Sequence, residues 1–161
     1  MKKLFFILYG LSFLFFSCAT SPEKKINSAY VMVYNFENEP VMDAEVFVDD
    51  NLAGVTDIYG RLMFPPVREK TGKKNKKYES THTIKVQKKG YETVSITGGI
   101  KAGQVFYFKT GTAEYYAAQA EESLDNGDFD DALKMINAAL LINERKDYLY
   151  LKKVIEERAE K

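Results

Sequence analysis

The chain has 161 residues, of which 45% are hydrophobic and 29% charged, a balance typical of folded proteins and unlike disordered tails or polytopic membrane proteins. Basic and acidic residues are equal at 23 each, so the net basic charge of a nucleic-acid-binding protein is missing and we expect no nucleic-acid partner. The single Cys and single His exclude an internal disulfide and an ordinary zinc site, and we expect no metal and no cofactor.

The N-terminal segment has the order of an export signal. Met1–Lys3 is basic, and the 13 residues Leu4–Phe16 are apolar apart from Gly10 and Ser12. A helix of that length rises about 20 Å, whereas the hydrocarbon core of a bilayer is about 30 Å thick. The segment is therefore too short for a comfortable permanent span.

A lone cysteine follows directly. Ser17, a small residue, precedes Cys18, and this arrangement resembles the bacterial lipoprotein signal, although Phe15 and Phe16 are bulkier than the residues usual there. The resemblance implies cleavage between Ser17 and Cys18 and a diacylglyceryl group on the Cys18 thiol. The alternatives are an uncleaved anchor helix and a plain secretory signal with an incidental Cys.

Lipidation would determine where the protein resides. Two acyl chains, at about 0.8 kcal/mol per buried methylene, anchor a protein stably to membrane lipid where one chain does not. Ala19 stands where the enteric inner-membrane retention signal has Asp, so the resemblance favours the outer membrane of the envelope. We predict a signal peptide over 1–17 and a lipidated linker over 18–28.

Residues 29–111 are patterned as short strands separated by turn residues. Alternation places Ala44, Val46 and Val48 on one face, and His82 on one face with Ile84 and Val86. His82 is therefore interpreted as a structural residue rather than a catalytic base, and no Ser-His-Asp motif accompanies it. About seven strands, a number typical of a small sandwich or barrel, are expected at 29–34, 44–48, 52–56, 61–64, 81–87, 91–97 and 105–108.

Two turn motifs in this region resemble a known family. Residues 54–60 read G-x-T-D-x-x-G, and Lys88-x-Gly90-Tyr91 follows about 30 residues later. The pattern resembles the carboxypeptidase-regulatory-like and PEGA group of transthyretin-like β-sandwich domains, which implies a non-catalytic accessory module. From the residues themselves we expect Asp57 to hydrogen-bond the turn backbone and Gly60 and Gly90 to adopt positive φ.

An insertion, residues 67–80, separates the fourth and fifth predicted strands where the resembled family has a short loop. Its positive charge suggests a patch for an acidic partner, and a solvated loop is the alternative. Residues 68–77 of this insertion carry one acid and six basic residues: Arg68, Lys70, Lys73, Lys74, Lys76 and Lys77.

The apolar period changes to 3.6 from Ala113 onwards, which predicts two helices broken at Gly127, where positive φ is expected, and a third helix up to about Ala159. Asp128 or Asp130 is the expected N-cap of the second helix. The helix pair resembles a single tetratricopeptide repeat, and one repeat leaves a face that must pack on the sandwich, on another copy or on a partner. The matching positions are Tyr116, Ala120, Gly127, Phe129, Ala132, Ile136 and Ala139.

The predicted fold is therefore α+β in two parts: a small β-sandwich over 29–111 and a helical region over 112–161. The mature strand region (18–111) has 14 basic and 11 acidic residues, whereas the helical region has 7 basic and 12 acidic. This asymmetry favours docking between the two parts or attraction between copies, so the oligomeric state stays open.

We predict a membrane-anchored envelope lipoprotein that is not an enzyme and binds a protein partner through Tyr115, Tyr148 and Tyr150, if their rings are exposed. An alternative function is binding of carbohydrate or cell-wall polymer by sandwich tyrosines, and a weaker one is regulation of an envelope enzyme. The sandwich tyrosines concerned are Tyr59, Tyr78, Tyr91 and Tyr107.

Overall fold

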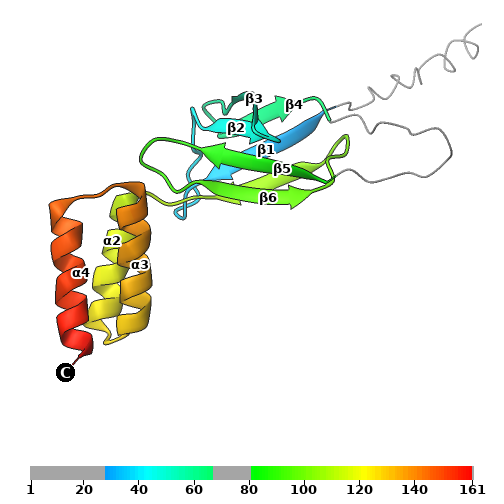
Figure 1. Cartoon of the computed structure of the whole chain (residues 1–161). Helices are drawn as coiled ribbons and strands as arrows, with labels where there is room; N and C mark the ends of the chain where they lie inside the picture. The colour runs from blue at the N-terminus through cyan, green and yellow to red at the C-terminus, as the bar shows by residue number, and fades with distance from the viewer. Residues whose placement is uncertain (1–27, 67–80, 161) are drawn as a thin grey trace, which may run out of the picture.

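The computed structural model describes residues 28–66 and 81–160, and within them seven strands precede three helices (Figure 1). This is the α+β, two-part fold that the sequence predicts. The strands are β1 (Ala29–Tyr34), β2 (Glu45–Val48), β3 (Asn51–Val55), β4 (Arg61–Phe64), β5 (His82–Gln87), β6 (Val94–Gly98) and β7 (Val105–Lys109). The helices are α2 (Ala113–Asp125), α3 (Phe129–Ile142) and α4 (Lys146–Ala159). None of these helices is long and apolar enough to span a bilayer.

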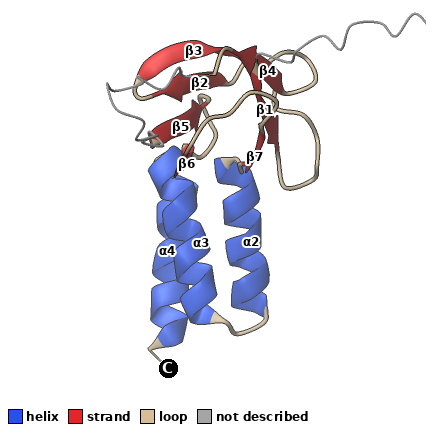
Figure 2. Cartoon of the chain, turned by 90° about the vertical axis from the view of Figure 1, so that its right-hand side faces the viewer, coloured by secondary structure: helices blue, strands red, loops and turns tan. Residues whose placement is uncertain are grey.

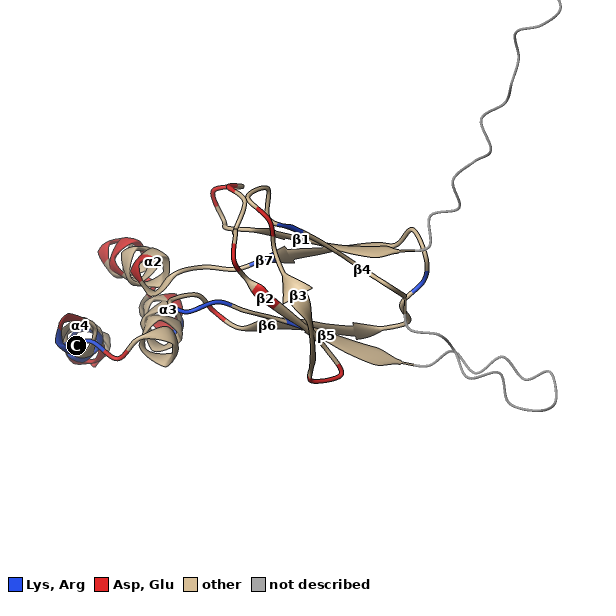
Figure 3. Ribbon diagram, turned by 90° about the horizontal axis from the view of Figure 1, so that it is seen from above, with Lys and Arg blue, Asp and Glu red and all other residues tan. Residues whose placement is uncertain are grey.

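The strands form two sheets that pack face to face. One sheet has the order β4-β1-β7, in which β1 is antiparallel to β4 and parallel to β7. The other has the order β3-β2-β5-β6 and is antiparallel throughout. Figure 3 shows the two layers, with β1 and β7 in one and β5 and β6 in the other.

Alternation along the strands builds the core between these sheets. In β1 every second residue is buried, so Ala29, Val31 and Val33 face inwards. In β5 the buried residues are His82, Ile84 and Val86, the set that the sequence placed on one face. The apolar sandwich core comprises Ala29, Val31, Val33, Val41, Ala44, Val46, Phe64, Ile84, Val86, Ile100, Phe106 and Phe108.

The turn between β3 and β4 carries the chain from one sheet to the other. The Asp57 carboxylate accepts hydrogen bonds from the amides of Tyr59 (2.8 Å) and Arg61 (2.9 Å), which is the turn chemistry expected from the sequence. Gly60 has φ of +70°, and a Cβ there would lie 2.3 Å from the Val33 carbonyl oxygen. Glycine is therefore required at this position by both conformation and space.

Strand β6 begins at Val94, three residues later than the sequence indicated. The preceding residues pair instead with the start of the helical part, because the Glu92 amide donates to the Gly111 carbonyl at 2.9 Å and Tyr91 forms an isolated bridge with Thr112. The turn before them has the expected positive φ at Gly90.

The helices begin and end close to the predicted positions. Asp128 accepts a hydrogen bond from the Asp131 amide as N-cap of α3, directly after Gly127 with φ of +79°. Ala120 of α2 and Ala132 of α3 are fully buried, so these two helices approach closely. Figure 2 shows the three helices side by side, extending away from one end of the sandwich.

Candidate binding surfaces

The three helical tyrosines predicted to bind a partner do not form one exposed cluster. Tyr148 is only 6% exposed and belongs to the helical core. Tyr115 is half-buried, and its ring stacks on Phe36 with centroids 4.8 Å apart. Tyr150 alone among them is freely accessible, with 71% of its surface exposed. The condition that these rings be exposed is therefore not met for Tyr148, which packs in the helical core, and is met only in part for Tyr115, which stacks on Phe36.

An aromatic joint connects the sandwich to the helices. The rings of Tyr115 and Tyr116, at the start of α2, contact Phe36 from the loop after β1. The Tyr116 hydroxyl donates to the Glu92 carboxylate, and burial together with this hydrogen bond raises the pKa of Tyr116 above its ordinary value. A Cβ on Gly111 would lie 2.8 Å from the Tyr116 ring, so the connecting backbone is packed closely.

The outer side of the helices carries an apolar groove between α3 and α4, with a volume of about 400 Å³. Leu141 is 89% exposed at one side of it, and Leu149 is half exposed on α4. Exposed leucine side chains that lie together around a groove are typical of contact surfaces, so the groove is a candidate contact surface. Its lining comprises Asn137, Leu140, Leu141, Glu144, Leu149 and Lys152.

A second apolar surface lies on the outward side of the β4-β1-β7 sheet and is called here the tyrosine face. Because the alternate residues of each strand face the core, the remaining ones share the outer side. The register places Tyr30 between Met63 and Val105. The tyrosine face comprises Tyr30, Met32, Tyr34, Met63, Val105 and Tyr107, with Arg61 and Lys109 as its charged members.

The tyrosines proposed for carbohydrate binding lie in different places. Tyr107 is 70% exposed on the tyrosine face, and Tyr59 is exposed in the adjoining turn, where the Arg61 guanidinium lies 4.6 Å from its ring centroid. Tyr91 is partly buried against the sandwich core, and the Lys88 ammonium lies 5.1 Å from its ring centroid. Outside the described residues are Tyr78 and the basic residues Arg68, Lys70, Lys73, Lys74, Lys76 and Lys77.

Sequence reasoning missed the outward residues of β1. Every residue from Ala29 to Tyr34 is apolar or aromatic, so the segment indicates a strand without showing that one side faces solvent. The pairing that brings Tyr30, Met32 and Tyr34 beside Met63 and Tyr107 comes from the fold, since parallel pairing of β1 with β7 joins residues far apart in the chain.

The only histidine has a structural contact. His82 Nδ1 lies 2.6 Å from a carboxylate oxygen of Asp49, and the other oxygen accepts a hydrogen bond from the Thr83 amide at 2.9 Å. The His82 hydrogen bond, followed by that of Thr83, lowers the pKa of Asp49 below its ordinary value. These contacts attach the β2–β3 turn to the start of β5. Within the described ranges, no group of three or more His, Cys, Asp and Glu side chains is arranged to hold a metal ion.

Comparison with protein-family models gave no match, and neither did comparison with curated proteins. Among solved structures the chain is similar to the Bacillus anthracis TIE protein, with a TM-score of 0.37 and 15% sequence identity over 55% of this chain. The chain spans 17% of the length of that protein. A likeness this slight carries no argument about fold or function.

Proposed function

We propose that this protein is a bacterial envelope lipoprotein, tethered to membrane lipid through acylated Cys18, that holds a protein partner on its helices without catalysing a reaction. The observation that carries the proposal is the placement of the two ends of the sandwich. β1 begins at Ala29 on the end opposite the helices, and α2 begins where β7 leaves the other end (Figure 1). A tether preceding residue 29 and a partner on the helices would thus lie at opposite ends.

The sandwich is suited to act as a spacer between these ends. A six-residue strand such as β1 spans about 20 Å at about 3.3 Å per residue. The aromatic joint of Phe36, Tyr115 and Tyr116 fixes the helices to this spacer. A lipid-attached chain of this design would place the length of the sandwich between the tethered end and the helices.

The helices offer the surface for a partner. Leu141, Leu149 and Tyr150 are exposed apolar or aromatic side chains on α3 and α4. The helical region has 12 acidic and 7 basic residues, so the partner expected is one whose contact surface combines apolar and basic groups. The tetratricopeptide-like pattern supports the same proposal, because an isolated repeat of this type leaves an unpaired face.

The tether is tested on the full chain expressed in bacteria. We expect the wild-type protein to sediment with membranes and to carry acyl chains on Cys18 by mass spectrometry. Cys18→Ser should leave the protein unacylated and, once its signal is removed, in the soluble fraction. An unmodified Cys18 thiol on the exported wild-type chain would contradict the tether.

The helical surface is tested with two tyrosines of matched exposure. Tyr150 on α4 is 71% exposed, and Tyr107 on β7 is 70% exposed. In pull-downs of the full chain from detergent-solubilised envelopes, we expect Tyr150→Ala to reduce capture of the specific partner at least tenfold and Tyr107→Ala to leave it unchanged. Equal capture by both variants would rule out Tyr150 as part of the contact surface.

The tyrosine face favours a second function, binding of carbohydrate or cell-wall polymer. Three of its side chains, Tyr30, Tyr34 and Tyr107, lie on one side of one sheet, and Tyr59 adjoins them. Aromatic rings with a polar hydroxyl suit ligands that have apolar faces and polar edges. Under this alternative, Tyr107→Ala weakens retention on purified wall polymer, whereas Tyr150→Ala leaves it unchanged.

A further inference from the structure

Strand β7 leaves one row of backbone groups unpaired. It is an edge strand of the β4-β1-β7 sheet. The Tyr30 amide donates to the Gln104 carbonyl (2.8 Å), and the Thr110 amide donates to the Tyr34 carbonyl (3.0 Å). These two bonds determine which residues of β7 turn their backbone groups towards β1 in the parallel pairing.

The backbone groups of Phe106 and Phe108 therefore hydrogen-bond to β1, and the N–H and C=O groups of Val105, Tyr107 and Lys109 point away from the sheet. No backbone hydrogen bond from residues 28–66 or 81–160 reaches those outward groups. The open edge of β7 therefore offers three donors and three acceptors.

Each of the other edge strands has or adjoins a feature that interrupts regular edge pairing, whereas β7 is uninterrupted along its length. Two prolines follow β4 directly, Gly98-Gly99 ends β6, and a register irregularity disturbs the pairing of β2 with edge strand β3. Natural sheets use prolines, bulges and charges to prevent such pairing. β7 reads Val-Phe-Tyr-Phe-Lys, without proline, glycine or acid, and has its single charge at the end.

We propose that the β7 edge pairs antiparallel with the β7 edge of a second copy of this chain across a twofold axis at Tyr107. The outward groups of Tyr107 then meet those of Tyr107 in the second copy, and Val105 lies opposite Lys109 of that copy. Six backbone hydrogen bonds close two three-stranded sheets into one continuous sheet of six strands.

The side chains fit a second copy in this register. The two Tyr107 rings become directly opposed neighbours on the outer side, where aromatic cross-strand pairs are favourable. Each Lys109 ammonium faces a Val105 rather than another cation, and its alkyl stem can cover that valine. The inward residues Phe106 and Phe108 stay in their own core. The tyrosine face would continue across the axis without a break.

The pairing is tested by photocrosslinking of the full chain in cells. A benzophenone amino acid replaces Tyr107 or, as a control, the equally exposed Tyr150 of α4. We expect an adduct of twice the monomer mass from position 107 and at most a tenth as much from position 150. No adduct, equal dimer adducts at both positions, or only adducts with other proteins at position 107 would overturn the proposal.

The register is tested by two changes at Val105, read out by the crosslink at position 107. Val105→Lys places a cation opposite Lys109 of the second copy and should reduce the dimer adduct at least fivefold. Val105→Glu introduces a charge of the opposite sign at the same site and should keep or increase the adduct. Equal effects of the two variants would contradict this register. The pairing does not depend on the fate of Cys18, so it and the proposed tether fail independently.

Discussion

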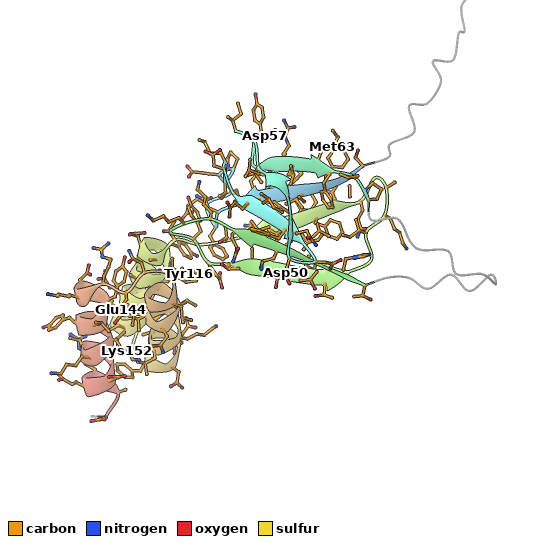
Figure 4. All side chains as sticks on the ribbon, turned by 45° about the horizontal axis from the view of Figure 1, so that its top comes forward. Asp50, Asp57, Met63, Tyr116, Glu144 and Lys152 are labelled. Atoms are coloured by element: carbon orange, nitrogen blue, oxygen red, sulfur yellow. The ribbon has the colours of Figure 1, made fainter. Side chains whose placement is uncertain are left out.

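The two outer faces of the sandwich differ in chemistry although their strands have similar lengths. The tyrosine face is formed by apolar and aromatic side chains with two cations, Arg61 and Lys109. The outer side of the β3-β2-β5-β6 sheet is polar along β5 and β6, and its apolar members, Phe47, Leu52 and Val55, lie on β2 and β3. Its polar residues are Glu45, Thr83, Lys85, Gln87, Ser95 and Thr97. Figure 4 shows Met63 and Asp57 on one side of the molecule and Asp50 on the other.

Polar contacts make the β2, β5 and β6 part of the second face suited to water. The Thr83 and Thr97 hydroxyls lie 3.2 Å apart across two strands, and Lys85 covers the Phe47 ring while it forms an ion pair with Asp50 at 2.9 Å. The tyrosine face has an equivalent contact only at its margin, where Arg61 meets Tyr59. The difference teaches that a covering partner is to be sought first on the tyrosine face, where apolar and aromatic side chains extend over all three strands.

The largest expected effect is a difference in unfolding free energy between substitutions of inward and outward residues of β7. Phe106→Ala empties a site in the sandwich core and should cost about 3–5 kcal/mol of unfolding free energy. Tyr107→Ala changes an exposed ring and should cost below about 1 kcal/mol. Urea unfolding measures both. Similar losses in the two variants would mean that the inner and outer sides of this sheet are assigned wrongly.

A smaller loss is expected at the turn that links the two faces. Gly60→Ala forces a side chain into a positive-φ position against the Val33 carbonyl, which should cost about 1–3 kcal/mol. Gly90→Ala is the matched control, because Gly90 also has positive φ but a Cβ there meets nothing within 4 Å. Thermal unfolding of both variants should show the greater loss for Gly60→Ala, and the reverse order would refute the close contact.

The sequence allowed the strands, the turns and the helix boundaries to be predicted because each has a local physical cause. Alternation predicted that Ala44 and Val46 share one face, Asp57 predicted the turn that its carboxylate stabilises, and Gly127 with Asp128 predicted the start of α3. Local patterns carry this information irrespective of what the element later packs against.

The exposed surfaces could not be predicted from the sequence, because they depend on contacts between residues that are far apart in the chain. Tyr115 and Tyr148 could not be distinguished from Tyr150 until the packing of Phe36 and the helical core was known. The Asp49–His82 contact joins residues 33 positions apart, and nothing local to either residue indicates it. Burial of a tyrosine on a helix is decided by its neighbours in space.

The contrast between the two outer faces can be measured as surface hydrophobicity. Met63→Lys with Tyr107→Lys should clearly shorten retention on a hydrophobic-interaction column, because both side chains are exposed on the tyrosine face. Ser95→Lys with Thr97→Lys adds the same charge to β6 on the outer side of the other sheet and should shorten retention less. Equal shifts would show that the two faces interact with apolar surfaces alike.

The smallest expected effect is on stability in acid. It is compared between the β2–β3 turn, which contains Asp49, and the β3–β4 turn, which contains Asp57. The pKa of Asp49 is lowered chiefly by the His82 hydrogen bond, and the pKa of Asp57 chiefly by the hydrogen bond from the Arg61 amide. A lowered carboxyl pKa stabilises the fold above the ordinary value of about 3.8, and this contribution is lost as the pH falls through the folded-state pKa.

Asp49→Asn and Asp57→Asn should therefore each flatten the dependence of unfolding free energy on pH below about 4, and the double variant should flatten it further. Urea titrations at a series of pH values measure the slope, and at neutral pH both variants should be less stable than the wild type. A steeper acid dependence in either variant would reverse the sign of the argument. Because the two aspartates serve separate turns, their effects should add, and strong coupling would place the β2–β3 and β3–β4 turns in one cooperative unit.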